Sequence, residues 1–392
     1  MNKNITELRA QIDEIDEKLI KLFADRMAVA ADIGRYKREN GISVLDESRE
    51  RKKLSAVAEM APEGMEDYTR LLYAQLFDLS RAYQERLIGQ SGSHSLSERV
   101  RAAREATPDY FGGKTASDRT PRIACQGVWG AYSQHAADQL FGRRPELLFF
   151  DTFEAVFSAV EKGLCDYGVV PAENNRAGSV HAVYDLMMEK NFSIVRSTRV
   201  KIDHSLLVKT GTKKEDIKYI YSHEQALSQC AAYLHKEFPL ASLVACKNTA
   251  EAAQYVSTCE GFETAAIASP DCAALYGLTR LENNIQGSDN NRTRFFCISK
   301  KTEIYPGADR TSLLLETENR PGALYRVLAR FYAHGVNLVK LESRPIPGTD
   351  FMFRFCFEIE AQVTDPAFTA LLDELSDMGD AVKYLGSYTE VM

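Results

Sequence analysis

The stretch TELRAQIDEIDEKLIKLFADRMAVAADIGRYKRE, residues 6–39, decides how the first part of the chain folds. It contains no proline and no glycine before Gly34, and Asn4 followed by Glu7 is typical of a capping box that starts a helix. A helix of about 34 residues is roughly 50 Å long, so its apolar stripe needs a comparably long partner. The stripe, at helical spacing, consists of Leu8, Ile12, Ile15, Leu19, Leu22, Phe23 and Met27.

Two further helical stretches follow, at about residues 45–60 and 66–88, with the breaker Ala61-Pro62-Glu63-Gly64 between them. Residues 1–90 are therefore predicted to form an all-α domain of three helices that pairs as an intertwined dimer. Over residues 91–120 the composition shifts to Gly, Ser, Arg and Thr, which predicts a linker. The segment Gly113-Lys114-Thr115 is not a phosphate loop, because that motif needs a glycine where Pro108 stands.

The rest of the chain contains two different mixtures of strands and helices. In residues 121–301, short apolar runs such as 147–150 alternate with helical stretches such as 152–162, which is an α/β pattern. Residues 311–392 are predicted to form strand, helix, strand, strand, helix and strand, and this βαββαβ order is typical of an α+β ferredoxin-like domain. A multidomain protein is also what a length of 392 residues predicts.

Composition excludes several classes of protein. Hydrophobic content of 45% and charged content of 26% are ordinary for a globular protein, and a net charge of −7 argues against nucleic acid as a partner. No apolar run approaches a membrane span and the N-terminus lacks a signal sequence, so we expect a cytoplasmic protein without a membrane partner. The 8 cysteines include no Cys-x-x-Cys pair, which indicates reduced thiols, without a metal site.

The polar face of the first helix carries Arg9, Arg26 and Lys37, and on charge alone a solvated face explains them. At 100° per residue, Arg26 and Lys37 lie within about 20° of each other, whereas Arg9 is roughly 25 Å from Arg26 along the axis. Only a second, antiparallel copy would bring its Arg9 to the other two. A shared site thus agrees with the predicted dimer.

Polar residues at helical spacing also occur in the second helix, as Asp46-x-x-Arg49-Glu50, and in the third, as Ser80-x-x-x-Gln84. Together with Leu8-Arg9-x-x-Ile12-Asp13-x-x-Asp16, they resemble the all-helical chorismate mutases over residues 5–88. The resemblance implies a pericyclic rearrangement of chorismate to prephenate, which needs neither nucleophile nor proton transfer. The implied roles fall to Arg9 of the partner subunit, Arg26, Arg49 and Ser80 for the carboxylates, Lys37 and Gln84 for the ether oxygen, and Asp46 and Glu50 for the substrate hydroxyl and the cations.

Four clusters occur in order in the middle of the chain: GVWGAYS at 127–133, DYGVVPAEN at 166–174, YSHEQAL at 221–227 and NRTRF at 291–295. Each is weak alone, but together they resemble prephenate dehydratase. The resemblance implies two α/β lobes around a cleft, as in a bilobed periplasmic binding protein, with the second lobe inserted at about residues 200–280. Prephenate would lose carboxylate and hydroxide together, so the site must assist departure of the hydroxide.

The resemblance also implies roles for single residues of this domain. Thr293 matches the catalytic threonine and would donate a hydrogen bond to the departing hydroxyl, with Glu173 as a second candidate for supplying the proton. On the residues alone, a helix cap for Asn174 and helix surface for Gln229 remain open as alternatives, and His204 and His223 are interpreted as structural. The residues expected to bind substrate are Ser133, Asn174, Ser222, Gln229 and Arg294.

Two segments near the C-terminus, ENRPGALY at 318–325 and ESRP at 342–345, resemble the signatures of the ACT regulatory domain. Without the resemblance, a helix start and a strand end would explain them. It implies phenylalanine as an effector bound between two paired domains. The implied contacts are Gly322, Ala323, Leu324, Glu342, Ser343, Arg344 and Pro345.

The three resemblances in this order predict a bifunctional chorismate mutase-prephenate dehydratase with feedback control, active without cofactor as a homodimer or dimer of dimers. Its ligands would be chorismate, prephenate and phenylalanine. A mutase joined to an NAD-dependent dehydrogenase would need a Gly-x-Gly-x-x-Gly turn after a strand, and the sequence has none. The other alternative is a cytoplasmic amino-acid-sensing binding protein without dehydratase activity, which would have no need for Thr293.

Overall fold

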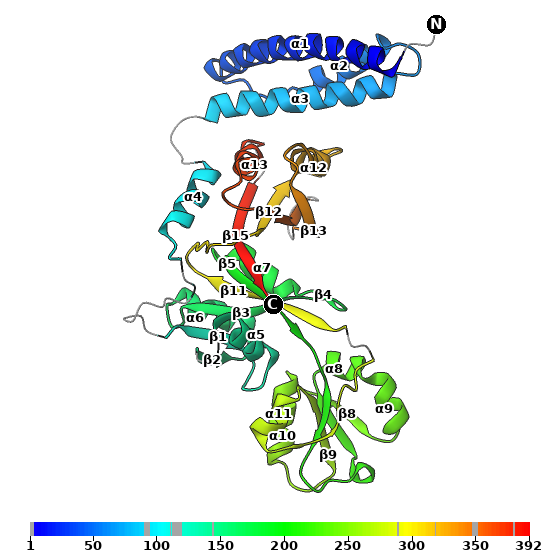
Figure 1. Ribbon diagram of the computed structural model, residues 1–392, viewed down its shortest axis with the longest axis vertical. Helices are drawn as coiled ribbons and strands as arrows, with labels where there is room; N and C mark the ends of the chain where they lie inside the picture. Colours follow the sequence, from blue (N-terminus) through cyan, green and yellow to red (C-terminus); the bar gives the residue numbers. More distant parts are fainter. Residues whose placement is uncertain are drawn as a thin grey trace. The chain divides into compact units, whose positions relative to one another are not determined.

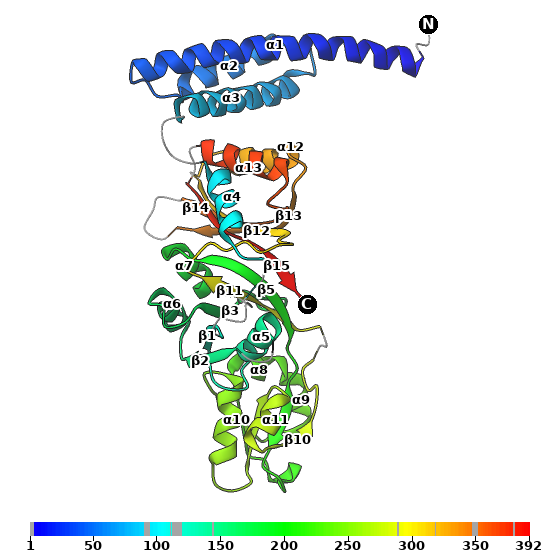
Figure 2. The same ribbon diagram turned by 60° about the vertical axis from the view of Figure 1, so that its left-hand side comes forward.

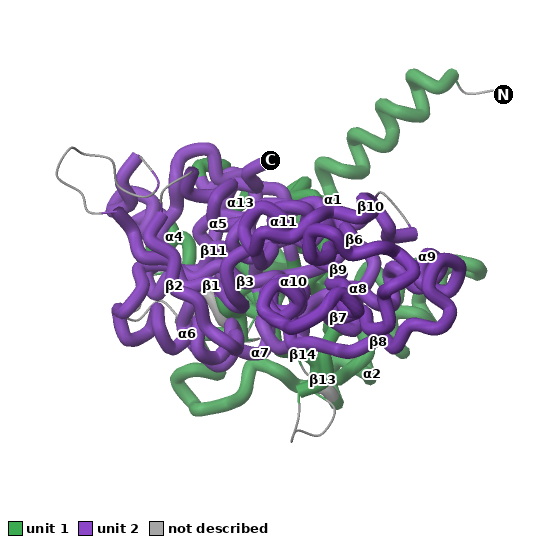
Figure 3. The backbone as a smooth tube through the Cα atoms, turned by 90° about the horizontal axis from the view of Figure 1, so that it is seen from below, with its two compact units in different colours: residues 1–100, 314–357, 364–383 green, residues 101–313, 358–363, 384–392 purple. Residues whose placement is uncertain are grey.

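The computed structural model describes residues 4–89, 95–109, 111, 120–142, 145–287, 290–317, 319–346, 352–378 and 381–392. The chain forms two compact units (Figure 3). Unit 1 contains residues 1–100, 314–357 and 364–383, and unit 2 contains residues 101–313, 358–363 and 384–392. The division runs through three C-terminal strands, so unit 2 includes short pieces of the C-terminal segment. Within the described ranges, no helix is long and apolar enough to cross a membrane.

The helical part of unit 1 consists of α1 (Ile5–Glu39), α2 (Glu47–Glu59) and α3 (Glu66–Gly89), which confirms the three predicted helices. The Asn4 side chain accepts from Thr6 N (3.3 Å) while Asn4 N donates to Glu7 (3.3 Å), so the predicted capping box starts α1. Both α1 and α2 pack on α3. The N-terminal part of α1 extends past α3 (Figure 2), because α1 is 35 residues long and α3 only 24.

A helix, α4 (Leu96–Ala106), lies within the segment predicted to be a linker. Ser95 and Glu98 form a reciprocal cap, in which Ser95 N donates to the Glu98 carboxylate (3.1 Å) and Glu98 N donates to Ser95 Oγ (3.2 Å). Ser97 donates to Asp373 through its backbone N–H and its hydroxyl. The linker prediction was wrong for these residues, because it relied on composition and overlooked a Ser-x-x-Glu signature that starts a helix.

The C-terminal elements are β12 (Arg310–Thr317), α12 (Ala323–Ala333), β13 (Asn337–Pro345), β14 (Phe353–Glu360), α13 (Pro366–Asp377) and β15 (Ala381–Val391). This is the predicted βαββαβ order, with strands arranged β13-β14-β12-β15. In unit 1, α12 packs against α13, and α13 also contacts α3. Val327 and Leu371 are fully buried on these two helices.

The first lobe of unit 2 is a sheet in the order β5-β11-β3-β1-β2, with β4 (Gly178–Ser179) paired to β3. Its strands are β1 (Arg122–Gln126), β2 (Glu146–Phe150), β3 (Tyr167–Asn174), β5 (Ser193–Lys201) and β11 (Arg292–Ser299), with helices α5 (Tyr132–Phe141), α6 (Phe153–Glu161) and α7 (His181–Glu189). Ile123, Val169 and Cys297 are fully buried in one core cluster, and burying such side chains stabilises by about 1.5–3 kcal/mol each. In addition, 389–391 of β15 pair in parallel with 196–198 of β5.

The second lobe is a sheet in the order β10-β6-β9-β7-β8, formed by residues 205–282 (Figure 1). Its strands are β6 (Ser205–Val208), β7 (Tyr219–Ser222), β8 (Ser242–Ala245), β9 (Thr264–Ala268) and β10 (Thr279–Glu282). The short 3-10 helix η1 (Lys214–Asp216) accompanies α8 (Glu224–Gln229), α9 (Ala231–Glu237), α10 (Thr249–Thr258) and α11 (Asp271–Tyr276). Because β5 leads into this lobe and β11 leads out of it, the bilobed α/β prediction is confirmed.

Candidate active sites

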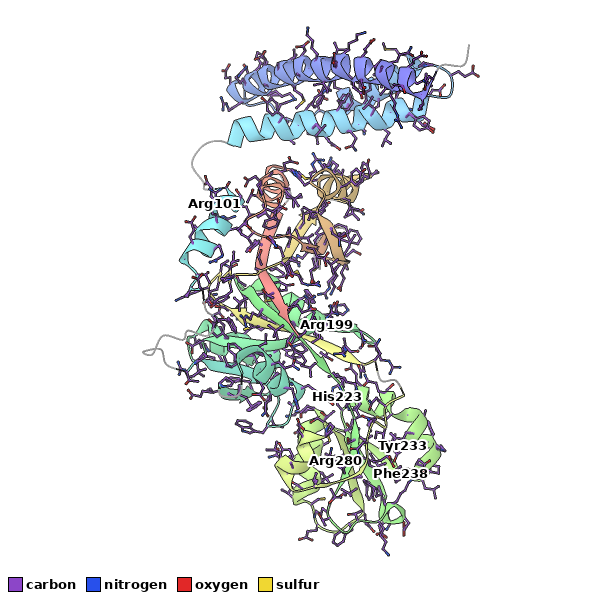
Figure 4. All side chains as sticks on the ribbon, in the orientation of Figure 1. Arg101, Arg199, His223, Tyr233, Phe238 and Arg280 are labelled. Atoms are coloured by element: carbon purple, nitrogen blue, oxygen red, sulfur yellow. The ribbon has the colours of Figure 1, made fainter. Side chains whose placement is uncertain are left out.

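A cavity of about 490 Å³ lies between the two lobes of unit 2. The first lobe contributes the ends of β3 and β11 and the first turn of α5, and the second lobe contributes the first turns of α8 and α10. Figure 4 places His223, at the start of α8, where the lobes meet. Of the residues predicted to bind substrate or act on it, the lining includes Ser133, Asn174, Gln229 and Thr293.

Strand alternation decides which residues of β11 reach this cavity. Thr293 and Phe295 line it, whereas Arg294 between them does not. Successive side chains of a strand point to opposite faces of the sheet, so Arg294 projects away from the cavity. Thr293 is directly opposite Asn174 in the antiparallel ladder of β11 and β3.

The side chain of Asn174 orients the hydroxyl of Thr293. Asn174 Oδ1 accepts from Arg176 N and Ala177 N, each at 3.0 Å, and since backbone N–H groups only donate, the opposite atom must be the amide nitrogen. This Nδ2 donates to Thr293 Oγ1 (2.9 Å) and to Asn291 Oδ1 (2.8 Å). Because Thr293 accepts from Asn174, its own proton remains available for a ligand in the cavity.

The chain of hydrogen bonds, each with a defined donor and acceptor, continues into the second lobe. Asn291, fully buried, accepts from Asn174 and therefore donates through its own Nδ2 to Gln229 Oε1 (2.8 Å). His204 Nε2 also donates to Gln229 Oε1 (3.0 Å). The two donors hold the carbonyl of Gln229, which leaves its NH2 group to donate to a ligand.

This arrangement defines the tautomer of His204. With Nε2 protonated, Nδ1 is an acceptor, and it is buried without a hydrogen-bond partner among the described residues. Burial lowers the pKa of His204 from its ordinary 6.5, opposed by a smaller effect of the hydrogen bond to Gln229. A neutral imidazole, 2% exposed, thus lines the cavity, although the sequence indicated a structural role.

Three of the predicted site residues do not line the cavity. Arg294, expected to bind a substrate carboxylate, binds the carboxylate of Glu358 of this chain on the opposite face of the sheet. Glu173 is opposite Arg294 in the ladder and lies 3.4 Å from its Nη1, which differs from the expected role as proton source. Ser222 is fully buried and donates to Ile267 O (2.6 Å). For Arg294 the motif is present, but the alternation of side chains along β11 turns this residue to the face away from the cavity.

Sequence reasoning missed Lys247, a cation in the lining of the cavity. It precedes Asn248, whose side chain accepts from Glu251 N (2.8 Å) and caps α10. The pattern Asn248-x-x-Glu251 is a helix-start signature that could have located a positive helix end here. Ser133, at the start of α5, donates to Gln126 O (2.6 Å) and thus offers the cavity only acceptor lone pairs.

In the helical domain, several predicted mutase residues lie along α1 and α3. Arg26 donates to Ser80 Oγ and to Leu76 O (3.1 Å), and Ser80 Oγ donates to Leu76 O (2.6 Å). Gln84 is 7% exposed against Gly34, so a side chain at position 34 would meet it. Its Oε1 has no hydrogen-bond partner within the described residues, which leaves a buried acceptor at this position.

The remaining predicted mutase residues have contacts within the chain. Lys37 donates to Val44 O (2.6 Å), and Asp46 caps α2 by accepting from Arg49 N (3.0 Å). Glu50 forms an ion pair with Arg81, which the sequence did not single out.

Arg81 also pairs with Asp78, whose pKa burial raises against the opposing effect of the arginine. Arg9 is not brought to these residues, since it lies 17 residues before Arg26 on the same helix, roughly 25 Å away.

The two C-terminal signatures occupy a helix start and a strand end. Gly322 caps α12 with φ of 83°, a conformation that favours glycine, and Ala323 is the buried first residue of that helix. Residues 342–345 end β13, while Glu318 lies outside the described residues. In the same unit but apart from the signatures, Arg354 pairs with Glu316 between β14 and β12.

Family models match three successive segments: chorismate mutase type II at residues 8–85, prephenate dehydratase at 123–303 and an ACT domain at 311–377. The bifunctional chorismate mutase/prephenate dehydratase of Aquifex aeolicus is 30% identical over 390 residues, covering 100% of this chain and 99% of that protein. The chain belongs to the bifunctional chorismate mutase/prephenate dehydratase family. The predicted order of domains, and both enzyme activities, are thereby confirmed.

Solved structures resemble part of this family member. Prephenate dehydratase from Arthrobacter aurescens, solved in complex with L-Phe, is 29% identical with a TM-score of 0.63, over 68% of this chain and 90% of that chain. A structure described as GqqA, a novel type of quorum quenching acylase, is 31% identical with a TM-score of 0.62, over 68% and 97%. Because bifunctional relatives match the whole chain, a binding protein without dehydratase activity is not favoured.

Proposed function

We propose that this chain converts chorismate to prephenate in its helical domain (residues 1–90) and prephenate to phenylpyruvate between the lobes of residues 121–301. Residues 311–392 would bind phenylalanine as feedback effector. The observation that carries the dehydratase assignment is the hydrogen bond from Asn174 to Thr293, which leaves the threonine proton directed at a ligand. We propose that the protein works in the cytoplasm and, by the argument below, as a dimer.

In the dehydratase step, Thr293 would donate to the hydroxyl of prephenate as its C–O bond breaks. A threonine hydroxyl is a poor acid, so its contribution is stabilisation of the developing hydroxide and not full proton transfer. The amide of Gln229 would add a second donor, and Lys247 with the first turns of α5 and α10 would attract substrate carboxylates. Aromatisation of the ring drives loss of carbon dioxide, so no protein group needs to stabilise the leaving carboxylate strongly.

In the mutase step, Arg26 and Lys37 would hold the folded dianion, and Gln84 would donate to the ether oxygen. A pericyclic reaction needs only this positioning and charge stabilisation. The apolar stripe of α1 supports a dimer, since its members are 42–56% exposed in one chain at Leu8, Ile12, Ile15 and Leu19. A second copy would cover the stripe and add Arg9 of the partner subunit to the site.

Phenylalanine is the proposed effector because the relative from Arthrobacter aurescens was solved with L-Phe and the chain matches the ACT domain. Gly322 supports this role, since the absence of a side chain lets a ligand approach the backbone that starts α12. The effector must bind one arrangement of the protein more tightly than another in order to inhibit.

One experiment tests the two reactions separately. The full chain would be supplied with chorismate while prephenate and phenylpyruvate are followed, with and without phenylalanine. Arg26→Ala should stop prephenate formation but leave turnover of added prephenate, and Thr293→Ala should do the reverse. Absence of phenylpyruvate from the wild-type chain would refute the dehydratase assignment, and equal rates with and without phenylalanine would refute the effector.

A further inference from the structure

Inside unit 2, a buried ion pair joins β11, the strand that carries Thr293, to β14 of the C-terminal segment, residues 311–392. Arg294, on β11, donates from Nη1 to Glu358 Oε2 (2.6 Å) and from Nη2 to Glu358 Oε1 (2.7 Å). Both side chains are 3% exposed. Glu358 lies on β14, within the residues that match the ACT domain, whereas Arg294 directly follows Thr293 in the segment that matches prephenate dehydratase.

Neighbouring charges balance this pair. Glu390 lies 3.0 Å from Arg294 Nε and 2.8 Å from Arg199 Nε, and Arg310 lies 3.1 Å from Glu358. The guanidinium of Arg294 also stacks over Tyr388, 5.8 Å from the ring centroid. Removing Arg294 and Glu358 together would leave Glu390 next to Arg199 and Arg310 3.9 Å from Glu360, while Glu173 would lose the guanidinium that lies 3.4 Å from it.

Stability does not explain why two charges are buried here. The desolvation of such a pair offsets most of its attraction, and apolar side chains of similar volume are often as stable or more so. What the pair does provide is orientation, because a two-pronged contact fixes the plane of the guanidinium. Held in this way, residue 294 restrains the strand position of Thr293 on one side, and Asn174 restrains its hydroxyl on the other.

We propose that Glu358 is a positioning residue for the dehydratase reaction: by holding Arg294 it fixes the part of β11 that presents Thr293 to the cavity. This proposal rests on the proposed function and deepens it. A residue of the C-terminal segment would then help to hold Thr293 in place. The dehydratase reaction would depend on this segment even when no effector is bound.

Glu358→Gln is the direct test, with Glu360→Gln as matched control on the same strand, where the side chain is half exposed and lies 3.9 Å from Arg310. We expect Glu358→Gln to lower dehydratase kcat by about 10- to 100-fold, with KM for prephenate nearly unchanged, because misplacing a donor weakens the transition state more than the bound substrate. Glu358→Asp should recover part of this loss, and Glu360→Gln should retain wild-type kcat. Mutase turnover of the same sample measures the amount of enzyme.

A second variant separates positioning from stability. Arg294→Met/Glu358→Leu replaces the pair with apolar side chains of similar volume, so the protein should unfold at or above the wild-type temperature. If its kcat falls while its unfolding temperature is maintained, the pair positions the strand. Wild-type kcat in this double variant, or in folded Glu358→Gln, would overturn the proposal. Failure of the proposed function is distinguishable, because the wild-type chain itself would then make no phenylpyruvate.

Discussion

Replacing Asn174 by aspartate turns the atom that donates to Thr293 and to Asn291 into an acceptor, and it leaves the size of the side chain unchanged. One carboxylate oxygen still accepts from Arg176 N and Ala177 N, so the turn after β3 is retained. The other oxygen replaces the donor that now lies 2.9 Å from Thr293 Oγ1. The hydroxyl of Thr293 would then donate to the carboxylate instead of to the substrate.

The structure sets the size of the effect. Loss of one donor aimed at developing negative charge costs about 10²–10³ in turnover, or ~2.7–4 kcal/mol. Because Asn174→Asp disables the donor of Thr293, it should cost about as much as Thr293→Ala. For the same reason the double variant should lose little more than either single variant, since both changes remove one interaction.

The assay is phenylpyruvate formation from prephenate, with mutase turnover of the same sample as the measure of enzyme amount. Asn175→Asp is the matched control, because Asn175 donates to Asn290 O (2.6 Å) and does not contact Thr293. The reasoning is refuted if Asn174→Asp stays within about threefold of the wild-type kcat, or if its loss adds fully to that of Thr293→Ala.

Four further outcomes are expected. Thr293→Ser should keep a substantial part of dehydratase turnover, because the hydroxyl remains, and a rate as low as that of Thr293→Ala would contradict this. Gln84→Glu should give mutase turnover that falls as pH rises, since a carboxylate cannot donate to the ether oxygen, whereas the wild-type profile should be flat near neutrality. The burial-lowered pKa of His204 means that the unfolded chain takes up its proton first as pH falls below 6.5, so stability should decline there, and His204→Gln should lessen the slope of unfolding free energy against pH. Glu358→Leu alone should cost about 3–5 kcal/mol of stability, because Arg294 stays buried without its two-pronged carboxylate partner, and an unchanged unfolding temperature would rule this out.

Periodicity and local signatures predicted much of the fold. The spacing of apolar residues located the long helix that begins at Ile5, and the alternation of runs and helices separated the α/β region from the βαββαβ region. One element was missed, since the cap at Ser95 and Glu98 starts α4 inside a stretch whose composition indicated a linker. Composition describes an average over many residues, whereas a helix start depends on two or three side chains.

The sequence predicted the residues of the candidate sites less accurately than it predicted the fold. The motifs located Thr293, Asn174 and Gln229, which all line the cavity, but they placed Arg294 and Ser222 there as well. A motif records which residues are present in a segment and not the face to which each side chain points.

The sequence by itself determined the kind of each element, the order of the domains and the residue types available for chemistry, because these depend on neighbours a few positions apart. Only the tertiary structure decided that Asn174 orients Thr293, that Gln229 connects Asn291 to His204, and that Arg294 binds Glu358. These partners are brought together by strand pairing and by the return of the chain from the second lobe to the first at β11. Which face of a strand a side chain occupies, and what lies opposite it, is set by packing of the whole sheet, which no local pattern encodes.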